Sequence, residues 1–250
     1  MKIDRTINKW FEETLAQINA NVRQIRQLDS LLIGVLHCVR KYCNGIILLL
    51  DNDHKMPAAA LLRILCELYA NLLWCFKVSD KEGKAADDNA IYKRFRRWGY
   101  KGVIEHEKML GKVSEATSGD YKQEVDKALK KLEKSKAEYK NQGIRCMPDT
   151  AGIFRELRRD WAAEVYPRIY QYFSRAVHLD MKLIREMVQY RGGQILCFSD
   201  PPSYKTGELL LYCISIGCDV NGLLRKYYGF DSEQMQTEYE SLSNELQSRR

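Results

Sequence analysis

Apolar residues recur every three to four positions along almost the whole chain, which is the spacing of an α-helix packed on one face, and strand-like alternation is nearly absent. Two of the segments, 28–50 and 57–78, are apolar on most faces and are expected to be the most deeply buried. The sequence therefore predicts an all-α helical bundle. The expected helices span about 7–22, 28–50, 57–78, 87–110, 120–139, 167–187, 209–228 and 231–247.

The segment at 120–139 differs from the others because lysine and glutamate dominate it. Its apolar stripe, formed by Val125, Leu129 and Leu132, is thin, so this helix is expected to bury little surface and to project. We predict a single domain over residues 1–250. Its parts are a core bundle at about 28–110 and 150–228, a charged helical hairpin inserted at about 112–142, and a polar C-terminal helix at about 231–248.

Composition adds the cellular setting. With 45% hydrophobic and 29% charged residues among 250, the chain has the balance of a folded globular protein. The first residues mix charges with few consecutive apolar positions, and the longest apolar run, Gly45 to Leu50, is far shorter than a membrane span. Eight cysteines without a CxxC pair indicate reduced thiols. We expect a cytoplasmic protein with no membrane segment, no metal and no cofactor.

Two otherwise apolar helices each carry a polar stripe. In the helix at 57–78 the stripe consists of Arg63, Glu67 and Asn71, at i, i+4 and i+8. The later helix repeats this spacing with Tyr170, Ser174 and His178, and carries Arg175 beside them. If the stripes face each other, they form a preorganised polar site in a low-dielectric bundle. The alternative is that they are solvated faces, or a satisfied network that only fixes helix register.

The two striped segments also resemble a known group of proteins. The run from Pro57 to Leu68, followed by Tyr170 to His178, is similar to an uncharacterised bacterial helical family that pairs an Arg-x-x-x-Glu helix with a later Tyr/Ser…His helix. The resemblance covers about residues 30–190. That family is similar in general layout to HEPN domains, which are helical bundles, frequently dimeric, many of them metal-independent ribonucleases of toxin and phage-defence systems. The resemblance thus implies RNA as a partner and a homodimer.

The chain departs from the HEPN signature, in which histidine follows arginine after four to six residues, because Arg175 lies only three positions before His178. The resemblance then implies either that the cation comes from another helix, with Arg63 the natural candidate, or that the protein is an inactive or purely binding relative. In RNA cleavage His178 would take the 2′-hydroxyl proton and Arg63 or Arg175 would stabilise the phosphorane, with Glu67 orienting the arginine. Substrate would be bound by Tyr170, Ser174, Arg175 and Asn71, and a second subunit would supply the missing leaving-group acid.

The charge distribution gives a second candidate surface. The net charge is +7, and residues 92–101 interleave cations with aromatic residues, a pattern that suits phosphate contacts and base stacking. The candidate nucleic-acid-binding residues are Lys93, Arg94, Arg96, Arg97 and Lys101. The alternative is a solvated helix in which Phe95 and Trp98 face the core while the cations point outward.

Two functional hypotheses follow. The first is a HEPN-like protein that acts on or binds RNA, as a metal-independent ribonuclease effector of a bacterial defence or toxin system. The second is a non-catalytic interaction module, in which the charged hairpin binds a protein partner and the buried polar stripes are structural. No complete catalytic motif decides between an enzyme and a binding protein.

Overall fold

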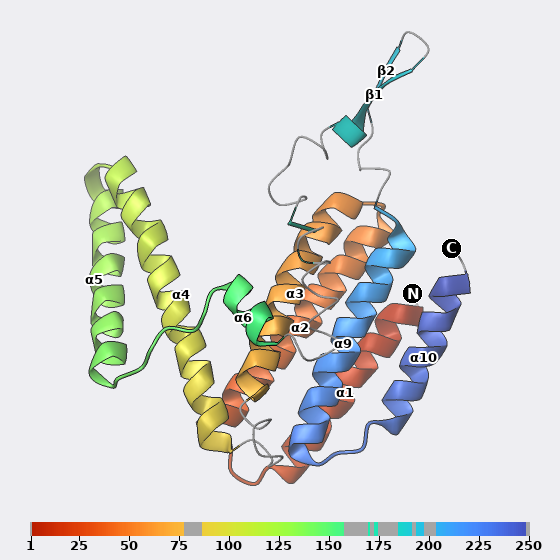
Figure 1. Cartoon of the computed structure of the whole chain (residues 1–250), viewed down its shortest axis with the longest axis horizontal. Helices are drawn as coiled ribbons and strands as arrows, with labels where there is room; N and C mark the ends of the chain where they lie inside the picture. Colours follow the sequence, from red (N-terminus) through yellow and green to blue (C-terminus); the bar gives the residue numbers. More distant parts are fainter. Residues whose placement is uncertain are drawn as a thin grey trace. The chain divides into compact units, whose positions relative to one another are not determined.

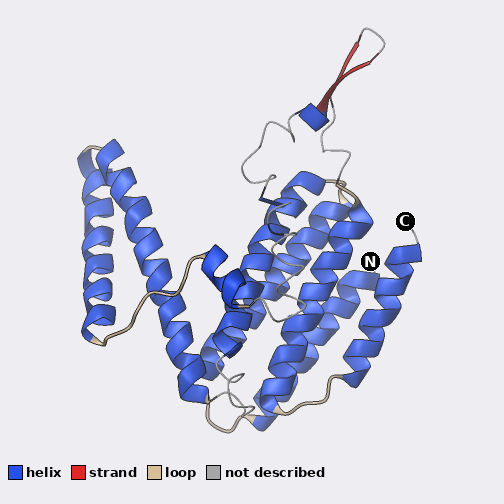
Figure 2. Ribbon diagram, viewed as in Figure 1, coloured by secondary structure: helices blue, strands red, loops and turns tan. Residues whose placement is uncertain are grey.

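The computed structural model describes residues 2–77, 87–157, 170, 173–174, 185–191, 194–197 and 204–248. The chain divides into two compact units, the first formed by Met1–Ala70 with Arg158–Arg250 and the second by Asn71–Leu157. Helices make up almost all of the described structure, as the periodicity predicted (Figure 2). The all-α fold class is therefore confirmed.

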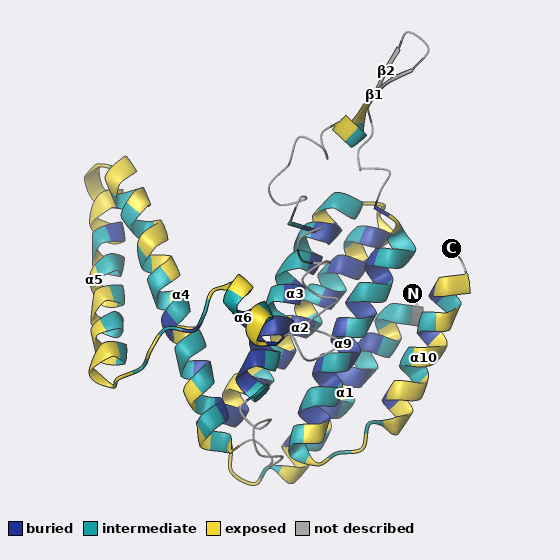
Figure 3. Ribbon diagram, in the orientation of Figure 1, coloured by how far each residue is buried: buried dark blue, intermediate teal, exposed yellow. Residues whose placement is uncertain are grey.

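The first unit is a helical bundle. Its helices are α1 (Lys2–Asn21), α2 (Gln27–Asp51), the greater part of α3 (Lys55–Phe76), α9 (Thr206–Tyr228) and α10 (Glu233–Ser248). Helix α9 packs against α1, α2 and α10 (Figure 1). The inward faces supply the core, with Trp10, Leu36 and Leu224 fully covered (Figure 3). This apolar surface, removed from water over several helices, is the main stabilising contribution to the bundle.

A buried arginine ties three elements of the first unit together. The Arg225 guanidinium of α9 donates to Thr14 Oγ1 at 2.9 Å, to the Asp231 carbonyl oxygen at 3.0 Å and to Glu13 Oε2 at 3.2 Å. Its side chain is only 5% exposed. Because each nitrogen has an acceptor, the cost of burying the charge is offset, and the contact fixes α1 and the start of α10 on α9.

The N-terminus of α2 is capped by a second charged cluster. The backbone N–H and the side chain of Arg26 both bond to Asp29, with Arg26 Nη2 lying 2.8 Å from Asp29 Oδ1. The hydroxyl of Tyr228, at the end of α9, donates to the same carboxylate at 3.0 Å. These interactions with Arg26 lower the pKa of the buried Asp29 carboxyl. The cluster therefore joins the start of α2 to the end of α9.

The C-terminal helix is amphipathic rather than wholly polar. It buries Met235, Leu242 and Leu246 against the bundle. Glu238 anchors it further, since Oε1 lies 2.5 Å from Lys9 Nζ and Oε2 accepts a 2.8 Å hydrogen bond from Trp10 Nε1. The polar helix expected at about 231–248 therefore exists, and a thin apolar edge attaches it to α1 and α9.

The second unit contains the last turns of α3, α4 (Asp88–Ala116), α5 (Gly119–Asn141) and α6 (Thr150–Glu156). Helices α4 and α5 lie side by side as a hairpin (Figure 1). Tyr100 stacks on Tyr139 with ring centroids 5.1 Å apart, and Ser114 Oγ donates to Asp126 at 2.6 Å. The turn between the two helices uses Gly119, whose φ of 69° favours glycine.

The charged hairpin is longer than the sequence predicted. The pattern ended the fourth helix at Leu110, before Gly111, whereas α4 runs on to Ala116. A glycine inside a helix costs only about 1 kcal/mol, which packing along α5 offsets. The whole of α4 lies in the second unit, where it contacts α5, and only Ile91, Phe95 and Tyr100 of its 29 residues are buried.

A short β-hairpin was not expected from the helical periodicity. Strand β1 (Val188–Arg191) pairs antiparallel with β2 (Gln194–Cys197), and Val188 lies opposite Cys197. Four residues per strand are too few for alternation to be distinguished from the surrounding pattern. The predicted helix starting near Pro167 is described only at single positions before Arg185, so most of it lies outside the described residues.

Among the residues that the structure describes, three helices are long and apolar enough to cross a membrane by length and composition: Gln27–Asp51, Lys55–Phe76 and Thr206–Tyr228. Within the most apolar window of each, 39%, 56% and 56% of the residues are buried inside the protein. The longest uninterrupted apolar run did not reveal them, because isolated polar residues break the runs without lowering the average much. The expectation that no segment enters a membrane stays a prediction.

Candidate functional site

The first polar stripe contacts a residue of the second through Arg63. Arg63 Nη2 donates a 2.7 Å hydrogen bond to the hydroxyl of Tyr170, and its guanidinium carbon lies 4.9 Å from the centroid of the same ring. Glu67, one turn further along α3, places Oε2 3.7 Å from Arg63 Nη2. Residues 107 positions apart in the chain therefore meet within the first unit.

The hydrogen-bond donors of Arg63 are only partly paired. Its side chain is 21% exposed and that of Glu67 is 30% exposed, so both groups reach the surface of the unit. Arg63 Nε is buried without a hydrogen-bond partner among the described residues. Arg225 in the same unit bonds through all three nitrogens. The buried Nε is closed to an added anion, so only the partly exposed remainder of the Arg63 guanidinium could contact one.

The later stripe is described at two of its three positions. Ser174 Oγ donates to the Tyr170 carbonyl oxygen at 2.7 Å, so this hydroxyl bonds within its own segment rather than to Arg63. Between them, Phe173 is buried and packs edge-on against Tyr212 of α9 at 5.8 Å. The burial of Phe173 holds the segment on α9. His178 and Arg175 lie outside the described residues.

Asn71 is the first residue of the second unit, whereas Arg63 and Glu67, the other members of its stripe, belong to the first. It is 5% exposed, and its Oδ1 has no hydrogen-bond partner in the described part of the chain. Helical spacing placed it in line with Arg63 and Glu67 correctly, yet the burial around it differs from theirs.

The arginines of the basic run contact an aromatic residue of α3. Both Arg94 and Arg97 lie over the Trp74 ring, with guanidinium carbons 4.5 and 5.0 Å from its centroid. Arg94 also donates to the Trp74 carbonyl oxygen, and Arg97 to that of Cys146 at 3.2 Å. Trp74 Nε1 donates to Glu156 Oε2 of α6 at 2.5 Å. We call these residues the Trp74 cluster; it joins α3, α4 and α6 within the second unit.

Of the remaining cations of the basic run at 92–101, two contact neighbouring side chains and one is exposed to solvent. Arg96 lies over the Tyr139 ring of α5 at 5.4 Å. Lys101 Nζ is 3.8 Å from Glu105, and its side chain is 12% exposed. Only Lys93 is classed as exposed among the five candidates. Two aromatic residues of the run, Phe95 and Tyr100, are buried and cannot stack on bases, and Phe95 stacks on Trp98 at 5.7 Å.

The buried thiols are poorly suited to nucleophilic chemistry. Burial raises the pKa of the Cys66 and Cys75 thiols far above the ordinary value, and it raises that of Cys218 to about 12. Thiols that stay protonated are poor nucleophiles and poor metal ligands. The described residues also contain no group of three or more His, Cys, Asp or Glu side chains that could hold a metal ion.

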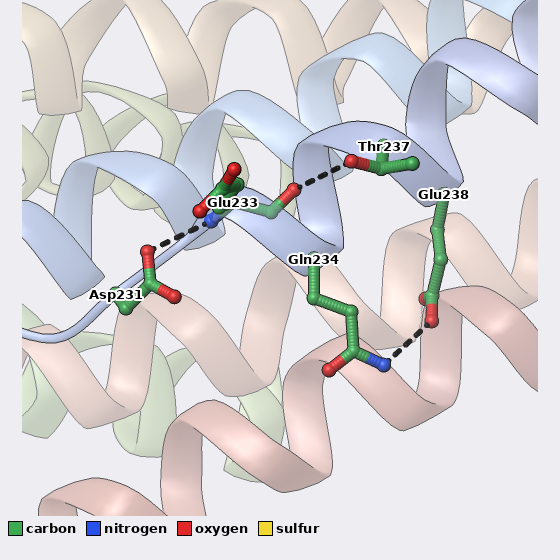
Figure 4. A pocket seen from close by; sticks show the side chains of 5 residues that line it. All are labelled: Asp231, Glu233, Gln234, Thr237 and Glu238. Atoms are coloured by element: carbon green, nitrogen blue, oxygen red, sulfur yellow. Dashed lines mark hydrogen bonds between the residues drawn. The ribbon is translucent and has the colours of Figure 1, made fainter.

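One shallow hollow of about 370 Å³ lies on the C-terminal helix, lined by Asp231, Glu233, Gln234, Thr237 and Glu238 (Figure 4). Its polar groups bond largely to each other, as when Gln234 Nε2 donates to Glu238 Oε1 at 3.2 Å. Its three carboxylates would repel a phosphate. This hollow therefore does not add to the RNA hypothesis.

The chain belongs to the DUF5677 family, a family of unknown function whose model matches residues 29–195. The expected membership of an uncharacterised helical family over about 30–190 is thus confirmed. The matched span holds both polar stripes and the whole second unit, whereas α1, α9 and α10 lie outside it. No curated protein and no solved structure matches the chain.

Proposed function

We propose that this chain acts on RNA at the polar centre around Arg63, by HEPN-like chemistry that needs no metal ion. The observation that carries the proposal is the contact between Arg63 and Tyr170, at 2.7 Å, since it joins the two segments whose polar stripes suggested a site. The partial exposure of the Arg63 side chain supports the same assignment.

In the proposed reaction His178 removes the proton of a ribose 2′-hydroxyl, and the 2′-oxygen attacks the adjacent phosphorus. The bond to the 5′-oxygen breaks, which leaves a 2′,3′-cyclic phosphate and a 5′-hydroxyl end. Arg63 stabilises the charge on the phosphorane, and Glu67 keeps the guanidinium oriented from 3.7 Å away. The proton for the leaving oxygen comes from a second subunit, so the active form is a homodimer.

A non-catalytic interaction module is the second candidate, and a specific observation favours it. Arg63 already has a hydroxyl, an aromatic face and a carboxylate as neighbours, and its side chain is only 21% exposed. Such a contact can also serve to hold the Tyr170 segment on α3. In that case the site is structural, and the protein partner binds the α4–α5 hairpin.

The decisive experiment is incubation of the purified chain with total RNA in the presence of EDTA. We expect cleavage products that carry cyclic phosphates. Arg63→Gln and His178→Gln should each lower the rate by about 100-fold or more. Arg23→Gln, which removes an exposed arginine of the same unit, should leave it unchanged. Absence of cleavage by the unmodified chain, together with a thermal destabilisation of Arg63→Gln alone, would establish the structural role instead.

The proposed setting is the bacterial cytoplasm, where an RNA-cleaving effector of defence or toxin type reaches its substrate. Induced expression of the unmodified chain should then arrest growth, and Arg63→Gln should relieve the arrest. Cell fractionation tests the location directly. Recovery of the protein only in the membrane fraction, released by detergent but not by high salt, would contradict a cytoplasmic site and would point to the three apolar helices.

A further inference from the structure

The side of α5 that faces away from α4 carries a row of lysines, in addition to the basic run of α4. Lys127, Lys130, Lys131 and Lys134 follow one another at i, i+3, i+4 and i+7, so they lie on one side of the helix. All four are exposed. We call them the lysine face. Asp126 and Glu133 lie at the edge of this side, each within one turn of Lys130, and Glu124 and Glu138 lie one turn from Lys127 and Lys134 at its two ends.

These lysines are unpaired, in contrast to a lysine on the opposite side of the same helix. Lys136 lies 2.5 Å from Glu107 of α4 in an interhelical ion pair. None of the four lysines of the lysine face makes an ion pair or a side-chain hydrogen bond among the residues that the structure describes. Neighbouring lysines repel one another by a few tenths of a kcal/mol per pair, and the carboxylates one turn away offset part of that repulsion without forming an ion pair.

Packing fixes the direction in which the lysine face points. Val125 is buried, and Leu129 and Leu132 are partly covered, on the side of α5 that meets α4. Helical spacing puts the lysines on the other side. Their direction within the hairpin is therefore set by the α4–α5 interface, and the long side chains extend into solvent.

Resting on the proposed action on RNA, we propose that the lysine face binds the phosphate backbone of that RNA through residues other than those of the Arg63 centre. The four ammonium groups span about 10 Å of helix axis, so they can contact neighbouring phosphates of one strand. Charge complementarity with a polyanion is the property that the face offers. No aromatic residue lies among the lysines, so binding is expected to depend on the backbone and not on base sequence.

An anionic membrane fits this surface less well than RNA does. Helices that lie on membranes combine a basic side with an available apolar side. The apolar side of α5 is occupied by α4, and the only large hydrophobic residue of α5 that is strongly exposed, Tyr121 at 59%, lies at its start. The lysine face can therefore reach phosphates, but it has nothing to insert into lipid.

The test compares two full-length variants that lose the same charge. The lysine-face variant carries Lys→Gln changes at 127, 130, 131 and 134. The control carries Lys→Gln at Lys108, Lys112, Lys122 and Lys140, which are exposed on the same hairpin but lie off the face. Glutamine has nearly the same helix propensity as lysine, so both variants should keep the helix, as circular dichroism will check.

Binding is measured with a fluorescent single-stranded RNA of about 20 nucleotides as KCl rises from about 50 to about 200 mM. Four phosphate contacts predict a loss of affinity of about 50-fold for the unmodified chain over this range. The lysine-face variant should lose at least about 10-fold in affinity at low salt and most of the salt dependence. The control should bind within about twofold of the unmodified chain, because its lysines do not contact the RNA.

Equal losses in both variants would overturn the proposal, since they would reflect net charge alone. Binding of the unmodified chain to phosphatidylserine vesicles or to a polyglutamate peptide, but not to RNA, would overturn it as well. The result is distinct from the cleavage test: Arg63→Gln should retain RNA binding, and the lysine-face variant should retain the Arg63 centre. Failure of one experiment therefore leaves the other standing.

Discussion

The two adjacent helices of the hairpin use their positive charges in opposite ways. In α4, Arg94 and Arg97 lie over Trp74 and donate to backbone carbonyl groups, so these cations contribute to the fold. In α5, the four lysines of the lysine face are exposed. The sequence pattern suggested nucleic-acid binding for α4 and only a solvated or protein-binding surface for α5. Within this unit the contacts suggest the reverse.

The physical reason is the difference between the two cations. A guanidinium is planar and weakly hydrated, so it stacks on an indole ring and enters partly buried positions. Burial lowers the pKa of Arg94, an effect that nearby Glu156 opposes. An ammonium group is strongly hydrated and stays in water on a flexible stem. Aromatic residues near arginines in a sequence therefore indicate an internal cluster as readily as a surface for bases.

The largest effect expected from this comparison is that of Trp74→Ala. The change removes the ring on which both arginines stack and the indole N–H that donates a hydrogen bond to Glu156. The second unit should therefore lose about 3–5 kcal/mol of stability. Hydrogen exchange resolved by segment measures the loss in α4 and α6. Trp98→Ala is the matched control, because Trp98 is only partly buried, and it should cost clearly less. Equal costs would contradict a special role for the Trp74 cluster.

A smaller loss of stability is expected when Arg94 is replaced, and almost none when its neighbour Lys93 is replaced. Arg94→Ala should destabilise the second unit by about 2 kcal/mol, because it removes a cation–π contact and a hydrogen bond to a carbonyl group. Lys93→Ala should change stability by less than about 0.5 kcal/mol, since Lys93 is exposed. Urea denaturation of both variants provides the measurement. A cost for Lys93→Ala as large as that for Arg94→Ala would mean that the run acts as a whole.

The stability of the first unit should depend on pH through another arginine that is held in an ion pair, Arg26. Its bond to Asp29 lowers the pKa of that carboxyl, so the contribution of the pair is complete above the ordinary value of about 4 and is lost as pH falls through the lowered pKa. Asp29→Asn should cost about 1 kcal/mol at neutral pH, a modest figure because the Arg26 side chain is 50% exposed. Thermal unfolding between about pH 7 and pH 2 should then converge for the two proteins at the acid end. A constant difference down to the lowest pH would contradict the assignment.

The smallest effect is expected for the lysine-face variant itself. Its stability should stay within about 0.5 kcal/mol of the unmodified chain, because no intramolecular bond of the described residues is removed. A slight gain is the expected direction, since repulsion between neighbouring lysines is relieved. Urea denaturation again provides the value. A loss of more than about 1 kcal/mol would show that these lysines support the fold and are not reserved for a partner.

Much of the candidate site was visible in the sequence. The i, i+4 spacing of Arg63 and Glu67 fixed their common side of α3, because a helix brings such pairs together whatever surrounds it. The sequence could only suggest that the two stripes meet. The contact between Arg63 and Tyr170 depends on how the helices of the bundle pack, which helical spacing does not determine. The anchoring of Phe173 on Tyr212 of α9 had no sequence signal at all.

The sequence alone determined the all-α fold class, the positions of most helices and the family, because helical periodicity and local motifs depend on neighbours within a few residues. Tertiary structure decided where the chain divides, that α4 belongs with α5, and which cations are covered. Those properties depend on contacts between residues far apart in the chain, and periodicity contains no information about which apolar side meets which. For the same reason, only the folded hairpin distinguishes arginines that hold it together from lysines that remain available to a partner.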